Sequence, residues 1–199
     1  MTRLYFFHMY PMAQESKDLS RNLERIFDDL KIKWRRRGTK DEYFYDIDIP
    51  DFDIDISLDT KSDEAGGRPS FHVLFYHEYI EKYSQRKVII PLILNLITKI
   101  MVDLEFDIGW FKDPFMEVET RAIIEVEKPP YVSCLNLWSK RYLKKLGIDG
   151  KPELPGFKTT PIDSYGWVVA YPLKYWRTRK GDQLESEGYR ELCKQTGKK

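Results

Sequence analysis

The stretch from Tyr43 to Asp59, YFYDIDIPDFDIDISLD, constrains the fold of this chain more than any other. On each side of Pro50, apolar and polar residues alternate, as they do in a strand with one buried and one solvated face. The polar positions are mostly aspartate, and neither Lys nor Arg occurs between Lys40 and Lys61. The sequence therefore predicts β-structure in which one face carries a row of carboxylates.

The alternation changes phase at Pro50, and two interpretations account for the change. A two-residue turn at Pro50 and Asp51 would pair Ile49 with Phe52, but it would also set Asp48 opposite an aspartate, and like charges directly opposed are destabilising. One long strand with a bulge resets the phase equally well and tolerates the proline. Both interpretations place the aspartates on one side of the sheet.

The chain's length and charge limit its architecture and its partners. A length of 199 residues suits one domain or two small ones, and we expect a single domain over residues 1–199 with a short frayed tail from about residue 196. The formal net charge of +1 gives the whole chain no preference for nucleic acid or membrane, so any preference comes from local segregation of charge. Cys134 and Cys193 are too few for a disulfide scaffold or a cysteine metal site, although two cysteines can in principle pair.

Neither of the two most apolar stretches reads as a targeting or membrane segment. The first residues lack the long apolar core and small-residue cleavage site of a signal peptide. The stretch from Val88 to Leu104 is interrupted by polar residues and is too short to span a bilayer. We therefore expect a cytoplasmic protein with no membrane partner.

The periodicity of the chain predicts an alternation of strands and helices. In the first half it predicts a strand over 3–10, a helix over 16–31 with Ser16 as N-cap, loops over 35–38 and 61–69, a strand over 70–76, a short strand over 86–90, and a helix over 91–104 that begins with Pro91. In the second half it predicts turns over 106–115, strands over 116–127 and 131–138, a helix over 139–146 capped by Gly147, a loop over 151–161, a strand over 164–175 interrupted by Pro172, and a short helix over 185–195. The fold class is thus α+β, with a mostly antiparallel or mixed sheet and two main helices, 16–31 and 91–104, packed on it.

The common catalytic and metal-binding motifs are absent from the sequence. It contains no G-x-S-x-G elbow, no G-x-G-x-x-G and no P-loop, and its three histidines lack the spacing of a helical zinc pair. The D-x-D-x-D run that begins at Asp51 opens like a calcium loop, but Ile56 stands where that loop needs glycine and Ser62 where it needs glutamate. We predict no catalytic residue, no cofactor and no metal ion.

The aspartate row has three interpretations that the residues alone leave open. It is a solvated sheet face, a surface that docks a partner, or a site at which two carboxylates share a metal ion. Trp110 and Trp167 are secondary candidates, because tryptophan is mostly buried but anchors partners where it is exposed beside a polar patch.

Several short motifs carry a resemblance to a known family. They are LYFFHMY at residues 4–10, IKW at 32–34, VIIPL at 88–92, FDIGW at 106–110, PPYVSCLNLW at 129–138 and LPGFKTTPIDSYGWVVAYPLKYW at 154–176. In their order and spacing these motifs resemble the bacterial polymorphic-toxin immunity proteins, specifically immunity family fifty-two. The quoted motifs do not include the aspartate row.

The resemblance implies a non-enzymatic inhibitor that binds a cognate toxin domain, of nuclease type, and blocks its active site. A nuclease presents a cationic cleft to phosphate, and an acidic surface can imitate that phosphate array. We expect a monomer that contacts no nucleic acid directly. The alternative is a metal-dependent enzyme acting on phosphorylated substrates through the aspartates. The candidate toxin-binding residues are Asp46, Asp48, Asp51, Asp53, Asp55, Asp59, Trp110 and Trp167.

Overall fold

One antiparallel β-sheet organises the chain. The computed structural model describes residues 3–11, 18–39, 42–49, 52–63, 65–76, 78–112 and 119–198. In these ranges nine strands form a sheet in the order β2-β3-β4-β5-β1-β6-β7-β9-β8, in which every neighbouring pair is antiparallel. Together with the helices, this sheet confirms the predicted α+β class.

Hairpins join β2 to β3, β3 to β4, β4 to β5 and β8 to β9, whereas β1 is inserted between β5 and β6 and β9 between β7 and β8. The strands are β1 (Arg3–Tyr10), β2 (Lys33–Gly38), β3 (Glu42–Ile49), β4 (Phe52–Ser62), β5 (Arg68–Tyr76), β6 (Ile108–Lys112), β7 (Leu135–Ser139), β8 (Lys158–Ile162) and β9 (Gly166–Ala170). The predicted strand over 3–10 is confirmed, and the strand predicted over 70–76 is the central strand β5.

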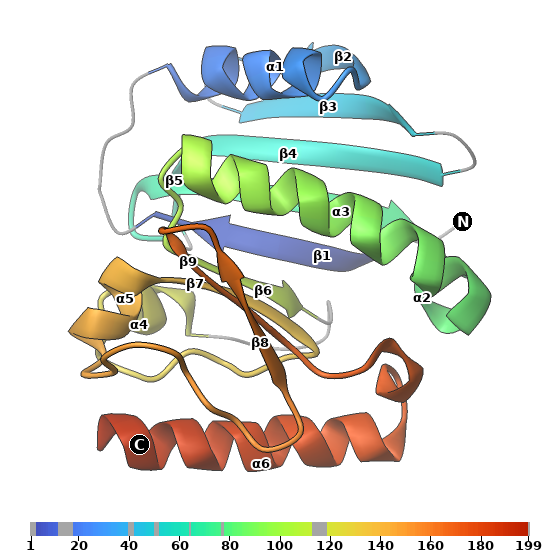
Figure 1. Ribbon diagram of the computed structural model, residues 1–199. Helices are drawn as coiled ribbons and strands as arrows, with labels where there is room; N and C mark the ends of the chain where they lie inside the picture. The colour runs from blue at the N-terminus through green and yellow to red at the C-terminus, as the bar shows by residue number, and fades with distance from the viewer. Residues whose placement is uncertain are drawn as a thin grey trace.

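The helices pack on both sides of the sheet. They are α1 (Leu19–Asp29), α2 (Glu78–Glu81), α3 (Tyr83–Asp103), α4 (Thr120–Ile124), α5 (Lys140–Lys145) and α6 (Arg179–Thr196), with a 3-10 turn η1 (Leu173–Tyr175) before α6. Figure 1 shows α1 beside β2 and β3, α3 across β4 and β1, and α6 at the opposite end of the molecule from α1. Among the residues described, no helix has the length and apolar character needed to cross a bilayer.

Two apolar cores lie on opposite faces of the sheet. The first joins Leu23 of α1 and Ile97 of α3 to inward residues such as Val73 of β5. The second joins the other face of β1, β6, β7 and β9 to the helices α4, α5 and α6. Within the described residues, this second core contains nothing from β2, β3 or β4. That face of the first strands therefore lacks the apolar packing that covers the rest of the sheet.

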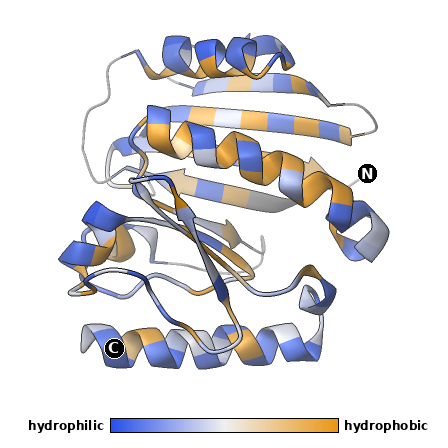
Figure 2. Cartoon of the chain, viewed as in Figure 1, coloured by the Kyte–Doolittle hydropathy of each residue, from blue (hydrophilic) through white to orange (hydrophobic). Residues whose placement is uncertain are grey.

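The register of β3 and β4 resolves the two interpretations of the Pro50 region. Ile49 pairs with Phe52, Ile47 with Ile54 and Asp48 with Asp53, which is the register of the two-residue turn. Pro50 and Asp51 themselves lie outside the described residues. Figure 2 shows hydrophilic and hydrophobic residues alternating along both strands, as the sequence predicted.

The predicted start of the second main helix is wrong. The residues expected to form a short strand, 86–90, belong to α3, and Pro91 lies well inside that helix. An interior proline costs ~3 kcal/mol or more, because it removes one hydrogen bond and clashes with the preceding turn. Ile89, Ile90 and Ile93 around it are at most 5% exposed. Their burial stabilises the helix by roughly 1.5–3 kcal/mol each, which outweighs the penalty.

Other boundaries also differ from the predictions. Segments expected as loops or turns over 35–38, 106–115 and 151–161 contribute the strands β2, β6 and β8, and the expected loop over 61–69 shrinks to a turn because β4 continues to Ser62. The strand predicted over 116–127 is replaced in its described part by α4, and α6 is longer than the predicted final helix. The helix predicted over 16–31 appears as the shorter α1, and Ser16 lies outside the described residues. Ser139 caps α5, and Gly147 follows that helix with a φ of 86°, as predicted.

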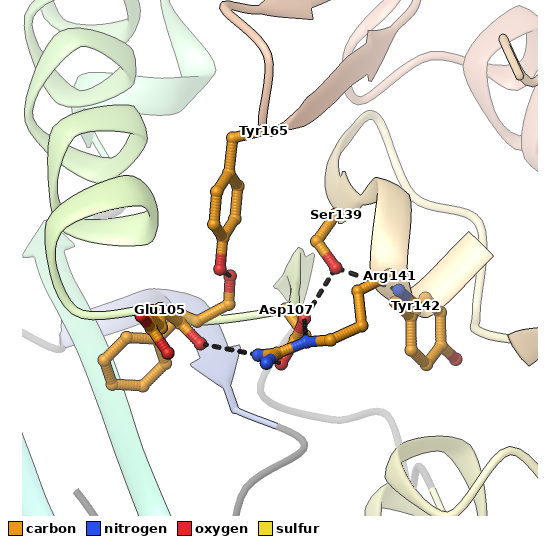
Figure 3. A network of polar contacts seen from close by, with 7 residues as sticks. Glu105, Asp107, Ser139, Arg141, Tyr142 and Tyr165 are labelled. Carbon is orange, nitrogen blue, oxygen red and sulfur yellow. Dashed lines mark hydrogen bonds and ion pairs between the residues drawn. The ribbon is translucent and has the colours of Figure 1, made fainter. Parts of the chain in front are cut away.

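A buried carboxylate joins the two halves of the sheet. Asp107, which is 0% exposed, directly follows Phe106 of the first core and precedes Ile108 of the second. It accepts hydrogen bonds from Ser139 Oγ at 2.6 Å and from Arg141 Nε at 2.9 Å and Nη2 at 2.5 Å (Figure 3). Ser139 Oγ in turn accepts from the backbone N–H of Tyr142 at 3.0 Å. One side chain thereby fixes the start of β6, the end of β7 and the N-terminus of α5.

Replacing this carboxylate by an amide is expected to destabilise the whole fold. Asp107→Asn replaces one buried acceptor oxygen by an amide donor that faces the N–H groups of Arg141, so buried hydrogen bonding is lost and we expect the free energy of unfolding to fall by about 2 kcal/mol. Urea denaturation measures the change. Asp103→Asn is the matched control, because it breaks the surface i,i+4 ion pair with Lys99 and should change stability by less than about 0.5 kcal/mol. Equal effects of the two substitutions would contradict the assigned role of Asp107.

Candidate functional site

Opposed carboxylates line the face of β3 and β4 that the second core leaves uncovered. The register sets Glu42 opposite Asp59, Asp46 opposite Asp55 and Asp48 opposite Asp53. Directly opposed residues of an antiparallel pair share one face of the sheet. We call this set the acidic face; it consists of Glu42, Asp46, Asp48, Asp53, Asp55 and Asp59. Sequence reasoning missed Glu42, because it precedes the alternating run.

The acidic face is most accessible at the end nearest the hairpin turn. Asp48 and Asp53 are exposed, and in the part of the chain that the structure describes neither side chain has an ion-pair partner. Asp46 and Asp59 are half-buried, whereas Asp55 is only 8% exposed. The exposed carboxylates of Asp48 and Asp53 are therefore the ones best placed to meet a partner.

The edge strand β2 borders the acidic face with positive charge. Lys33 pairs in register with Asp48 and Arg35 with Asp46, and Arg37 forms an ion pair with Asp46. The sequence prediction had treated the arginines as a loop and missed this neutralisation. Exposed ion pairs contribute little to stability, typically about 0–1 kcal/mol. Their consequence here is that the negative field is strongest on the β4 side of the hairpin, away from β2.

Two packed elements hold the hairpin from its other face. The Tyr79 hydroxyl of α2 accepts a hydrogen bond from the backbone N–H of Asp53 at 3.1 Å, and the Phe52 and Tyr79 rings meet edge to face with centroids 5.0 Å apart. On the α1 side, the Tyr45 hydroxyl donates to Glu24 at 3.4 Å, and burial, followed by Glu24, raises the pKa of Tyr45. The carboxylates of Asp48 and Asp53 thus project from a backbone that is fixed in place.

Trp110 is not a surface anchor, and that prediction is wrong. It is 0% exposed, and its ring stacks on Tyr10 with centroids 5.2 Å apart. The reason is its strand: β6 lies between β1 and β7, and the face that carries Trp110 is covered by the second core. Sequence reasoning placed Gly109 and Trp110 in a turn-rich passage and kept Trp110 as a secondary candidate, although it expected tryptophan to be mostly buried.

Trp167 does not join the acidic face either. Trp167 is half-buried on β9 and packs against the second core. The sheet order places β9 five strands from β4, which is roughly 24 Å at about 4.8 Å per strand. Asp51 lies outside the described residues. Within those residues, no group of three or more His, Cys, Asp or Glu side chains is arranged to hold a metal ion.

A half-buried carboxylate, Glu185, lies far from the acidic face, on α6. Glu185 accepts hydrogen bonds from the hydroxyls of Tyr131 and Tyr171, each at 3.0 Å. Burial raises the pKa of Glu185, although the two tyrosine hydrogen bonds act in the opposite direction. Burial also raises the pKa of the neighbouring Cys134 thiol, and both Cys134 and Cys193 are free. A thiol with a raised pKa is a poor nucleophile, so this cluster supports the attachment of α6 and not catalysis.

Comparison with known proteins adds no relatives. Neither a protein-family model nor a curated protein matches this chain. The resemblance to the immunity family therefore stays a prediction that rests on its short motifs. The geometry of the acidic face is then the main structural observation that bears on function.

The opposed aspartates should destabilise the free protein. Asp53→Asn removes the repulsion between Asp53 and Asp48 without removing an ion pair, so we expect the free energy of unfolding to rise by about 0.5 kcal/mol at low salt. The gain should shrink as salt screens the repulsion. Asp149→Asn, an exposed carboxylate beyond α5, makes the same chemical change elsewhere and is the matched control. A loss of stability in Asp53→Asn would show that the charges do not repel.

The raised pKa of Glu185 predicts a pH dependence of stability. Folding favours the protonated form, so ionisation destabilises the native state as the pH rises from the ordinary value of 4.5 through the higher folded value. Glu185→Gln keeps the shape but cannot ionise, and its stability relative to the wild type should increase over that pH range. Chemical denaturation at a series of pH values measures this difference. Glu187→Gln, which changes an exposed hydrogen bond on the same helix, is the control, and a flat difference for Glu185→Gln contradicts the prediction.

Proposed function

We propose that this chain is an immunity protein that binds a cognate bacterial toxin domain of the nuclease type and blocks its active site. The protein makes and breaks no bonds in this role. It acts in the cytoplasm as a monomer that occupies the cationic cleft of the toxin. The observation that carries the proposal is the pair of exposed, opposed aspartates, Asp48 and Asp53, at the hairpin end of the acidic face.

The energetics of the hairpin support a binding role. Like charges directly opposed on a sheet face destabilise the free protein by some tenths of a kcal/mol per pair. Folding alone gains nothing from keeping Asp48 and Asp53 together, and a neutral or oppositely charged pair would be more stable. A cationic partner surface removes the repulsion and gains attraction from both carboxylates. The arrangement is therefore better suited to a complex than to the isolated chain.

The same geometry supports fast and oriented association. Fixed surface charges of one sign steer an oppositely charged partner and raise association rates by about 10–1,000-fold at low salt. The carboxylates lie on a paired, helix-backed hairpin, so little conformational entropy is lost when a partner docks. A nuclease cleft is cationic because it must bind phosphates. The motif resemblance to the immunity family points to the same class of partner.

The proposed contact surface differs from the one expected from sequence. It centres on Asp48 and Asp53, with the half-buried Asp46 and Asp59 at its border. Asp55 is too buried to contact a partner and contributes only through its electric field. Neither Trp110 nor Trp167 takes part.

Charge reversal at the hairpin end tests the surface. We expect Asp48→Lys/Asp53→Lys to slow association with a catalytically inactive form of the toxin encoded beside this gene by about tenfold or more, and to flatten the dependence of the rate on salt. Stopped-flow fluorescence over a series of salt concentrations measures both effects. Asp149→Lys/Glu153→Lys changes the net charge equally at two exposed positions between α5 and β8 and should leave the rate within about twofold.

Two different results would count against the proposal at two levels. If the hairpin variant and its control associate equally fast, the acidic face is not the docking surface. If cells that express the adjacent toxin die despite co-expression of the wild-type protein, the immunity function itself is excluded.

A further inference from the structure

A basic pocket lies at the other end of β4 from the hairpin turn. It has a volume of about 430 Å³, and its walls are formed by Arg68, Ile124, Glu125, Val126, Lys145 and Lys198. Pockets that hold small molecules typically span about 300–1,000 Å³. Three cations face one carboxylate around this space, so the pocket has an excess of positive charge.

Arg68 is the buried centre of this pocket. Its side chain is only 10% exposed, and Nη1 donates to the Ala65 carbonyl at 3.2 Å and to Glu125 Oε1 at 3.5 Å. Nε is fully buried and has no hydrogen-bond partner. Leaving a buried donor unsatisfied typically costs about 1–3 kcal/mol, and more when the group is charged. The guanidinium is thus fixed in the wall of the pocket by Ala65 and Glu125.

The single carboxylate of the pocket is already engaged. Glu125 Oε1 accepts from Arg121 Nε at 3.2 Å as well as from Arg68. Arg121 also packs against the turn at Gly66, where a Cβ would lie 3.5 Å from its Cδ and 3.3 Å from Arg68 Nη1. Glu125 therefore holds two arginines side by side and does not neutralise the two lysines.

An unusual backbone conformation positions one of the lysines. Val126 has a φ of 62°, a region that β-branched residues rarely adopt and that costs about 1–3 kcal/mol. Its N–H donates to the Ile123 carbonyl at 3.1 Å, and its own carbonyl accepts a hydrogen bond from Lys198 Nζ. The strained residue thereby ties the ammonium group of Lys198 to the pocket rim. Lys145, exposed on α5, forms no ion pair within the described residues.

We propose that this pocket binds a phosphate group, either as inorganic phosphate or at the end of a small phosphomonoester. A dianion matches the excess of positive charge, and the guanidinium of Arg68 in the pocket wall is a cation of the kind that binds phosphate oxygens. Lys145 and Lys198 supply point charges on the open side. This site is independent of the acidic face and of the proposed toxin.

A ligand-dependent shift in melting temperature tests the site in the full-length protein. Sodium phosphate, adenosine monophosphate and adenosine are compared against sodium chloride at equal ionic strength. We expect saturable stabilisation by the first two and none by adenosine. Lys145→Glu should raise the half-saturating concentration by about tenfold, because it reverses a charge at the rim. Lys144→Glu makes the same change at the adjacent exposed residue outside the pocket and should change it by less than about twofold.

The outcomes separate the two sources of the phosphate and the ways in which the proposal fails. Adenosine monophosphate binding at least about tenfold tighter than phosphate identifies a phosphomonoester site, and equal binding identifies a site for the phosphate ion itself. Absence of saturable stabilisation beyond the chloride control overturns the proposal. Equal effects of Lys144→Glu and Lys145→Glu overturn the proposal too, because they show that the general charge of the surface attracts the phosphate and that the pocket does not bind it specifically. Both substitutions are on the surface, so neither test depends on a buried residue.

Discussion

The fold depends on one ion pair that is buried on its acidic side. Asp107 is fully enclosed, whereas its partner Arg141 remains half exposed, so a single charge is removed from water and three hydrogen bonds compensate it. Removing Arg141 would leave the enclosed carboxylate of Asp107 as an uncompensated buried charge, which costs far more than the formation of the pair gains. The pair lies where the chain passes from the first core to the second, between Phe106 and Ile108. The ion pair therefore links the packing of α3 on one face of the sheet to the packing of α5 on the other face.

The acidic face follows from the way the helices are distributed over that sheet. In the described residues, α1 and α3 cover one face of β2 to β5, and the second core covers the opposite face only from β1 onward. A sheet that is packed on one side alternates apolar and polar residues, as the run from Tyr43 to Asp59 does, although Asp55 and Ser57 on its polar face are buried. Any polar residue, including Lys and Thr, can occupy a solvated position on this face of the sheet. The choice of aspartate at opposed positions is what goes beyond the needs of the fold.

Sequence reasoning succeeded where local pattern and tertiary environment agree. The alternation along β3 and β4, the helical stripe of α1 and the placement of Gly147 after α5 each depend on neighbouring residues alone. It failed where burial overrides local preference. Pro91 marks a helix start on propensity but lies inside α3, because the isoleucines around it are buried.

The functional sites show the same division. The aspartates are visible in the sequence because they are neighbours along the chain. Their partial neutralisation by β2 is not visible, since Arg35 and Arg37 read as a loop until β2 pairs with β3. The phosphate pocket has no local signal at all, because Arg68, Glu125, Lys145 and Lys198 come from four separate segments. The buried thiol of Cys134 and the polar cluster around Glu185 are assigned a structural role because they are wholly or partly buried.

The near-zero net charge of the chain conceals two regions of opposite sign. Asp53 lies near the start of β4, and Ser62, which pairs with Arg68, lies at its end. At about 3.3 Å per residue this separation is roughly 30 Å, several times the Debye length of about 8 Å at physiological salt. The charges of one region therefore do not cancel the electric field of the other, and each region presents its own field to solvent. A formal charge of +1 accordingly says nothing about which partners this protein attracts, because each partner meets one end of β4 and not the sum of the two.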